Sequence, residues 1–235
     1  MEISEKLAHM EEWWETDTGN ICKEKLSHDN FRDIAESCGI NFRKGIHDLL
    51  DFKRKNDMPM LVVSAGVGEL IKAWFEIVTE ERGSNIDELK PFGIVSNLGI
   101  FENNELIKFN LPLVHIMNKA KHVKKFVDDQ IELDAQHHHH LRSNIIVMGD
   151  IIEDLQMISD IKWDNIIKIG FLNNMDIDSH LEEEYVKAFD IVILHDGNLW
   201  PVTALLELFK DRKITWKDKL PQEFSEFLCQ FEKEE

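Results

Sequence analysis

From residue 60 onward the chain alternates short apolar runs with amphipathic stretches, and this alternation restricts the fold more than any other feature. The apolar runs have the length of strands and occur at 60–63, 93–95, 145–148, 166–169 and 191–194. Helix-like stretches lie between most of them, at 67–80, 119–130, 152–160, 180–188 and 200–210. Strands that alternate with helices form a mainly parallel sheet with helices on both faces. The pattern therefore predicts a Rossmann-like α/β fold, in which ligands bind at the carboxyl ends of the strands.

The first 55 residues follow a different pattern. Leu7, Met10 and Trp14 recur at helical spacing, as do Phe31 and Ile34, and no run there resembles a strand. This stretch predicts a small helical subdomain. The expected domains are thus a partial helical cap at 1–55 and an α/β core at 56–235.

Composition excludes two classes of partner. The chain has 27 basic and 45 acidic residues, for a formal charge of -18, and would repel the phosphate backbone of a nucleic acid polymer. The first residues do not place a basic region before an apolar run, and no stretch approaches the 18 or so uncharged apolar residues of a membrane span. Neither nucleic-acid binding nor membrane insertion is therefore expected.

The cysteine and histidine residues do not predict a disulfide framework or a zinc site. Cys22, Cys38 and Cys229 are odd in number, widely separated and never in a Cys-x-x-Cys pair. A reducing cytoplasm fits this usage. The consecutive residues 137–140 are all histidine, and because neighbouring side chains cannot all point at one ion, we interpret them as a solvated loop.

Polar residues follow the predicted strands in an order typical of phosphoryl transfer. Ser64-Ala65-Gly66 follows the first strand, Lys119 opens a helix, Gly149-Asp150 follows the third strand, and Asp154 comes four residues later. A hydroxyl and backbone amides can hold phosphate oxygens, a lysine neutralises their charge, and carboxylates hold magnesium. The sequence therefore predicts a phosphate and magnesium site at this edge of the sheet.

Each of these residues taken alone also fits an ordinary structural role. Ser64 fits a small-residue turn, Lys119 a solvated helix position and Asp150 the cap of the next helix. Asp154 fits a surface position, although it would share one helix face with Asp150. Four such coincidences in the correct order are much less frequent than one, so the functional interpretation is preferred.

The same segments resemble a known group of enzymes. Phosphatases of the haloacid-dehalogenase superfamily have four motifs: an Asp-x-Asp nucleophile loop, a Ser or Thr after the second strand, a Lys, and a Gly-Asp followed by a further Asp. Three of the four are present here. Over roughly residues 4 to 205 the chain looks like the cytosolic pyrimidine and 7-methylguanosine-phosphate 5'-nucleotidases, most clearly at 63–68, 95–97, 115–119, 149–155 and 167–173.

The resemblance implies a role for each residue of the site. Ser64, with Ala65 and Gly66, would bind the transferring phosphate, and Lys119 would stabilise its charge. Asp150 would be a Mg²⁺ ligand. Asp154 would orient a water of the metal or Lys119.

The metal-side loop departs from the family pattern at two positions. Ile151 replaces the usual Ser after Gly-Asp, and Glu153 replaces a Gly. These changes alter the surroundings of the metal but leave the aspartates in place.

The resemblance also suggests which side chain faces the base. Glu12-Trp13-Trp14 looks like a helix of the family's cap, in which the aromatic at the position of Trp14 faces the base. Trp in this place resembles the 7-methylguanosine branch, and a methylated guanine carries positive charge that a Trp ring attracts. The alternative is that Trp13 and Trp14 simply pack among the helices.

The nucleophile motif of the family is missing. No Asp-x-Asp-x-Thr or Asp-x-Asp-x-Val occurs in residues 1–235, and Asp176-Ile177-Asp178 comes closest but fits a surface loop. By resemblance, the central first strand is missing as well, so the strands that end at Ser64 and Asp150 would each have an unpaired edge. We therefore expect a truncated product or an incomplete gene model of a longer enzyme.

The expected function is that of a Mg²⁺-dependent 5'-nucleotidase. The substrate would be a nucleoside 5'-monophosphate, namely 7-methylguanosine monophosphate, UMP or CMP, and catalysis would be compromised by the missing motif. The alternative is a non-catalytic pseudophosphatase that binds nucleotide or a protein partner. An acidic interaction protein that uses the fold only as a scaffold is the least favoured interpretation. The sequence predicts no oligomeric state.

Overall fold

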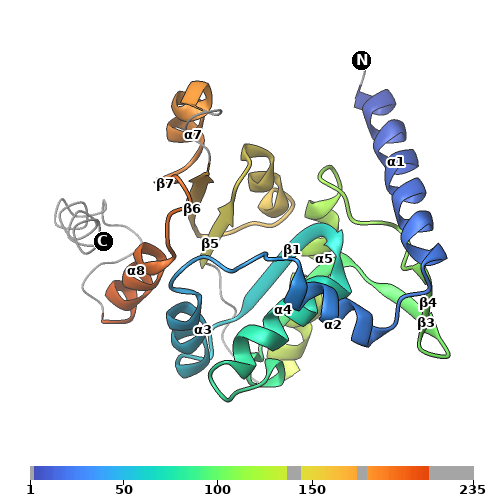
Figure 1. The fold of residues 1–235 in the computed structure, drawn as a ribbon. Coiled ribbons are helices and arrows are strands. Elements are labelled where there is room, and N and C mark those ends of the chain that lie inside the picture. Colours follow the sequence, from blue (N-terminus) through green and yellow to red (C-terminus); the bar gives the residue numbers. More distant parts are fainter. Residues whose placement is uncertain (1–2, 137–143, 174–178, 212–235) are drawn as a thin grey trace.

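The computed structural model describes residues 3–136, 144–173 and 179–211. The amino-terminal part is helical, as predicted, and comprises α1 (Ile3–Lys23), α2 (His28–Ser37) and α3 (Ile46–Lys55) (Figure 1). The start of α2 is determined locally, because Ser27 and Asn30 form a capping box in which each side chain accepts a hydrogen bond from the other's backbone N–H. Whether residues 1–55 form a separate domain stays a prediction.

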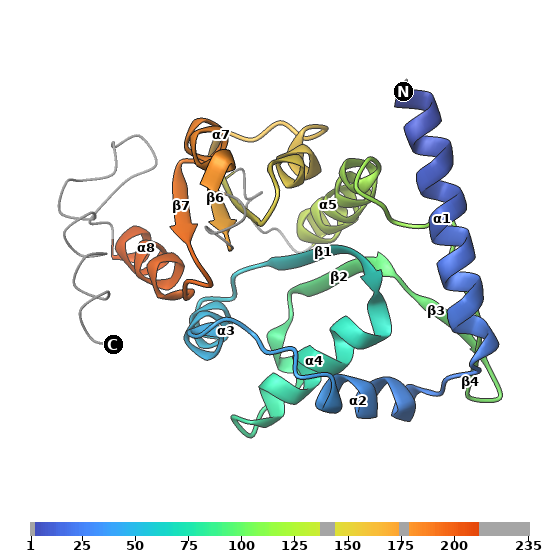
Figure 2. The same ribbon diagram turned by 45° about the horizontal axis from the view of Figure 1, so that its top comes forward.

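The predicted strands are all present, and the first two form a parallel pair. β1 (Met60–Val67) pairs with β2 (Phe92–Asn97), and the register shifts between Val63 and Val67. Figure 2 shows α4 (Gly68–Glu80) on one side of this pair and α5 (Lys119–Gln136) on the other. The approach of α5 is close, since a Cβ on Gly93 would lie 2.4 Å from the ring of Phe126. This arrangement confirms the α/β class with helices on both faces.

The second parallel sheet has the strand order β5-β6-β7. Its strands are β5 (Asn144–Gly149), β6 (Asn165–Leu172) and β7 (Ile191–Leu194), and α8 (Trp200–Lys210) follows them. The helix expected at 152–160 is instead a 3-10 helix, η2 (Ile152–Ile158), in which the Asp154 N–H bonds to the Ile151 carbonyl three residues back. The helix expected at 180–188 is divided into η3 (Ser179–Leu181) and α7 (Glu182–Ala188).

The two parallel sheets are not hydrogen-bonded to each other. Among the described residues β1 pairs only with β2, and β5 pairs only with β6. This separation agrees with the expectation that the strand between them is missing. The sheets are nevertheless linked by apolar packing, because Leu61 and Val63 of β1 lie against the same cluster as Val147 of β5 and Val123 of α5.

An antiparallel hairpin lies after β2 and was not predicted. Its strands are β3 (Gly99–Glu102) and β4 (Glu105–Phe109), and Asn103 and Asn104 between them have φ angles of 50° and 64°. Left-handed residues suit a two-residue hairpin turn, and asparagine tolerates them. Asn103 and Asn104 therefore form the hairpin turn, whereas strands of four and five residues were too short to recognise from apolar periodicity.

The largest apolar core joins the helical start to both sheets. Leu49 of α3, Val78 of α4, Ile169 of β6 and Leu205 of α8 are all buried in one cluster. Burial of such side chains is the main favourable contribution to folding, on the order of 1.5–3 kcal/mol for each.

Further expectations from the sequence concern the cysteines, the loops and membrane insertion. Cys22 and Cys38 are free thiols, as expected. The histidines at 137–140, Asp176-Ile177-Asp178 and Cys229 lie outside the described residues. Throughout the described ranges, every helix is either too short or too polar to cross a lipid bilayer.

An ion pair between α2 and α4 gives a prediction of pH dependence. Arg32 donates hydrogen bonds to both carboxylate oxygens of Glu80, at 3.0 and 2.7 Å, and these bonds lower the pKa of Glu80 from its ordinary value. A carboxyl group with a lowered pKa stabilises the fold above its unfolded-state pKa, and this contribution is lost as the pH falls through the folded-state pKa. Arg32→Met is expected to raise the pKa of Glu80 back toward 4.5, which an NMR titration of the Glu80 carboxyl would measure.

Lys90→Met is the control, because Lys90 contacts Asp87 and not Glu80. It is expected to leave the pKa of Glu80 unchanged. A Glu80 pKa that is the same with and without Arg32 would contradict the prediction.

Candidate active site

The first predicted site segment lies where the register of β1 against β2 shifts. Ser64-Ala65-Gly66 is half-buried, and the Ser64 Oγ accepts a hydrogen bond of 3.0 Å from the Gly66 N–H. Helix α4 begins at Gly68, so its amino-terminal N–H groups lie two residues beyond this segment. Such N–H groups, together with a hydroxyl, are suited to phosphate oxygens.

Asn97 connects the end of β1 to the loop that precedes α5. Its side chain is 1% exposed, and the Nδ2 donates to the carbonyls of Ala65, at 2.7 Å, and Val114, at 3.0 Å. The Oδ1 accepts from the Val114 N–H at 2.6 Å. In the sequence, Asn97 stood out only as part of the segment 95–97 that resembles the family, and no role was expected for it. The available signal was a polar residue two positions after the apolar run 93–95.

A second asparagine shapes the same loop. The Asn118 Oδ1 accepts from the His115 N–H at 2.8 Å, and its Nδ2 donates to the Leu113 carbonyl at 2.7 Å. These bonds turn the chain just before α5, of which Lys119 is the first residue. The position of Lys119 therefore depends on side-chain hydrogen bonds within the preceding loop.

Lys119 and Asp154 form a buried ion pair. The Lys119 Nζ lies 2.6 Å from the Asp154 Oδ1, and the two side chains are only 12% and 8% exposed. Gly149 leaves the space for this carboxylate, since a Cβ there would lie 2.5 Å from the Asp154 Cβ. The alternatives that Lys119 is a solvated helix residue and Asp154 a surface residue are thus wrong.

Asp150 lies beside this pair at the end of β5. Its backbone carbonyl accepts a hydrogen bond from the Tyr185 hydroxyl, while its carboxylate is exposed and makes no hydrogen bond or ion pair with any described residue. Tyr185 itself is buried against Leu172 and Phe189, so it anchors the backbone of Asp150 to the core. The backbone of Asp150 is therefore held in place, while its carboxylate is left available.

The side chains near Asp150 could supply only part of the coordination shell of a magnesium ion. In the described ranges no three His, Cys, Asp or Glu side chains come together as a metal cluster. Mg²⁺ is usually held by one or two carboxylates together with substrate phosphate and water, so it does not need such a cluster. The free carboxylate of Asp150 fits one of these ligands.

Trp14 lies apart from these groups. It is half-buried in α1, makes an edge contact with Trp13 at a centroid distance of 4.9 Å, and packs against the cluster that contains Phe31 and Leu106. The structure thus brings Lys119 and Asp154 together, beside Asp150. Ser64 is linked to them through Asn97 and the loop, and Trp14 lies against the hairpin.

Comparison with known proteins identifies the family. The pyrimidine 5'-nucleotidase (UMPH-1) family matches residues 1–210. The 7-methylguanosine phosphate-specific 5'-nucleotidase of Gallus gallus is 31% identical over 209 residues, which cover 87% of this chain and 66% of the relative. The putative cytosolic 5'-nucleotidase 3 of Caenorhabditis elegans is 28% identical over 201 residues, which cover 84% of this chain and 50% of the relative. The chain therefore spans about half to two thirds of the length of these relatives.

Solved structures agree with the sequence comparison. The crystal structure of cytosolic 5'-nucleotidase IIIB bound to cytidine superposes with a TM-score of 0.68 and 27% identity, covering 91% of this chain and 68% of that one. A probable phosphoserine phosphatase from Vibrio cholerae gives a TM-score of 0.50 at 13% identity, covering 83% and 52%, and this likeness shows the fold alone. Together with the family match, these findings show that the chain belongs to the pyrimidine 5'-nucleotidase (UMPH-1) family, phosphoric monoester hydrolases with the haloacid-dehalogenase fold.

Proposed function

We propose that the protein binds a nucleoside 5'-monophosphate in the cytoplasm, at a site of the kind that carries out Mg²⁺-dependent hydrolysis of the phosphate. The observation that carries this proposal is the buried pair of Lys119 and Asp154, held against Gly149 and beside the free carboxylate of Asp150. Burying an ion pair costs desolvation energy, so such a pair is a weak means of gaining stability. It is a good means of holding an ammonium group where a phosphate is to bind.

Each residue of the chain has a part in this proposal. The Ser64 hydroxyl and the backbone N–H of Ala65 bind phosphate oxygens, the Gly66 N–H holds the Ser64 Oγ in place, and Lys119 neutralises the charge of the phosphate. Asp154 positions Lys119, and Asp150 would hold Mg²⁺. A bound Mg²⁺ would supply further positive charge at the phosphate.

These residues do not include the covalent nucleophile. No Asp-x-Asp-x-Thr or Asp-x-Asp-x-Val occurs in residues 1–235. We therefore propose that residues 1–235 by themselves bind nucleotide but release no phosphate. The same absence favours a second candidate function, that of a pseudophosphatase that binds nucleotide or a protein partner without turnover.

The base is proposed to be recognised by Trp14. The relatives include several that are named as 7-methylguanosine phosphate-specific, and the similar crystal structure contains cytidine. The ring of a 7-methylated guanine carries positive charge, which the face of a tryptophan attracts. In this structure Trp14 packs on the hairpin, so the proposal requires α1 to present its ring to the base.

The test combines binding with turnover. Binding of 7-methylguanosine monophosphate, UMP and CMP is measured by calorimetry with and without Mg²⁺, and phosphate release is measured in parallel. We expect Mg²⁺-dependent binding that weakens at least about tenfold in Lys119→Ala, because a charged hydrogen bond contributes about 1.5–3 kcal/mol. We expect no phosphate release.

Lys124→Ala is the matched control, because Lys124 lies on the same helix in an exposed pair with Asp128. It is expected to bind nucleotide like the unaltered chain, and circular dichroism checks that both variants are folded. A folded chain that binds none of the three nucleotides would overturn the proposal. Turnover that Lys119→Ala abolishes would show instead that another carboxylate serves as nucleophile.

A further inference from the structure

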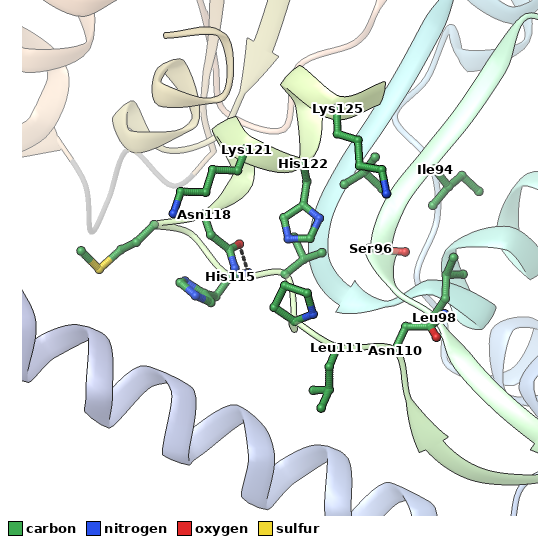
Figure 3. A pocket seen from close by; sticks show the side chains of 14 residues that line it. Ile94, Ser96, Leu98, Asn110, Leu111, His115, Asn118, Lys121, His122 and Lys125 are labelled. Atoms are coloured by element: carbon green, nitrogen blue, oxygen red, sulfur yellow. Dashed lines mark hydrogen bonds between the residues drawn. The ribbon is translucent and has the colours of Figure 1, made fainter. Parts of the chain in front are cut away.

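A pocket of about 710 Å³ adjoins the candidate active site, because Val114, His115 and Asn118 of the loop before Lys119 line it. It is formed where β2, the loop at 110–118 and the first turns of α5 meet (Figure 3). None of the proposed phosphate, metal or base residues lines it. The pocket is therefore a different binding space that shares one loop with the proposed nucleotide site.

The charged and titratable side chains that line this pocket are all basic. They are His115, Lys121, His122 and Lys125, and no aspartate or glutamate of the described residues lines the pocket. The chain as a whole has a formal charge of -18, so this grouping runs against its composition. A concentration of positive charge in a cavity attracts anions.

The lysines of the pocket are not neutralised by the protein. Lys121 and Lys125 are exposed and make no ion pair with any described residue, whereas Lys124, on another face of α5, pairs with Asp128 at 2.8 Å. Figure 3 shows Lys121, His122 and Lys125 along the α5 wall of the pocket. Burial lowers the pKa of His122, and the neighbouring charges of His115 and Lys125 lower it further.

Part of the remaining lining is apolar and exposed. Leu98, Leu111 and Met117 line the pocket and are 37%, 77% and 39% exposed. A lone phosphate ion would leave this surface in water and most of the volume empty. An organic group attached to the phosphate would cover it.

We propose that this pocket binds a small organic phosphate. The phosphate group lies against Lys121, His122 and Lys125, and the organic part covers Leu98 and Leu111. The site is independent of the nucleotide site at Ser64 and Lys119, so it stands even if the proposed function is wrong.

Phenyl phosphate is the probe, with inorganic phosphate and phenol as its two halves, and calorimetry is the measurement. We expect phenyl phosphate to bind more tightly than either half. Lys121→Gln with Lys125→Gln is expected to weaken its binding at least about tenfold, because two charged hydrogen bonds are lost. Leu111→Ser is expected to weaken the binding of phenyl phosphate but not that of inorganic phosphate.

Two controls separate this site from non-specific charge and from the nucleotide site. Lys108→Gln with Lys124→Gln removes the same charge from exposed positions elsewhere and is expected to change affinity less than twofold. Ser64→Ala is expected to have as little effect. The proposal is overturned if phenyl phosphate does not bind, if the Lys121 and Lys125 variant binds as the unaltered chain does, or if Ser64→Ala abolishes binding.

Discussion

Asp154→Ala is expected to lower the free energy of unfolding by about 3–5 kcal/mol, the usual cost of leaving one member of a buried ion pair without its partner. The Lys119 ammonium would keep its buried position, 12% exposed, without the carboxylate that now lies 2.6 Å away. Domains of this size are commonly stable by only about 5–15 kcal/mol. The loss is therefore a large part of the total, and urea unfolding followed by circular dichroism would measure it.

The matched control for this variant is Asp128→Ala. It removes a lysine–aspartate contact of 2.8 Å from the same helix, α5, but both side chains are about half exposed. Exposed pairs contribute about 0–1 kcal/mol, so the expected change is small. Equal effects of the two substitutions would contradict the buried pair.

A double variant tests whether the cost arises from the unpaired charge. Lys119→Met with Asp154→Ala removes both charges, and it is expected to be more stable than Asp154→Ala alone, since no buried ion is left without a partner. If the double variant loses as much free energy of unfolding as the two single variants lose together, the two residues contribute independently.

Asn97→Ala is expected to cost about 3 kcal/mol or more. The substitution leaves the Ala65 carbonyl and both the N–H and the carbonyl of Val114 without their present partner, in a place where Asn97 is 1% exposed. Each buried polar group without a partner costs about 1–3 kcal/mol. Because Asn97 connects the Ser64 segment to the loop before Lys119, nucleotide binding is expected to weaken as well.

Chemical unfolding and amide hydrogen exchange together check this prediction. The Val114 amide now donates to Asn97 at 2.6 Å, and it is expected to lose protection from exchange in the variant. Asn165→Ala is the control, because Asn165 donates to Asn144 at an exposed edge of the second sheet. A change within about 1 kcal/mol for Asn97→Ala, with Val114 still protected, would show that the bonds are dispensable.

Much of the fold was predictable because its signals are local. The apolar runs at 60–63 and 145–148 became β1 and β5. Ser64 lies within β1, where its register against β2 shifts, and Asp150 directly follows β5. The sequence also predicted that the parallel strands would not form one continuous sheet, since the motif that accompanies the central strand does not occur in it. The structure accordingly has two separate parallel sheets. The hairpin at 99–109 was missed because its strands are short and partly exposed.

The sequence by itself determined the order of strands and helices, the family, and the residue types available for a phosphate and a metal. Only the tertiary structure decided how they meet. Lys119 and Asp154 are 35 residues apart, Asn97 and Val114 are 17 apart, and the pocket joins β2 to α5. Such contacts depend on packing between elements, whereas apolar periodicity reports only which face of one element is buried. The resemblance allowed Asp154 to orient either a water of the metal or Lys119, but the burial of its pair with Lys119 and the basic pocket became visible only when the elements were placed together.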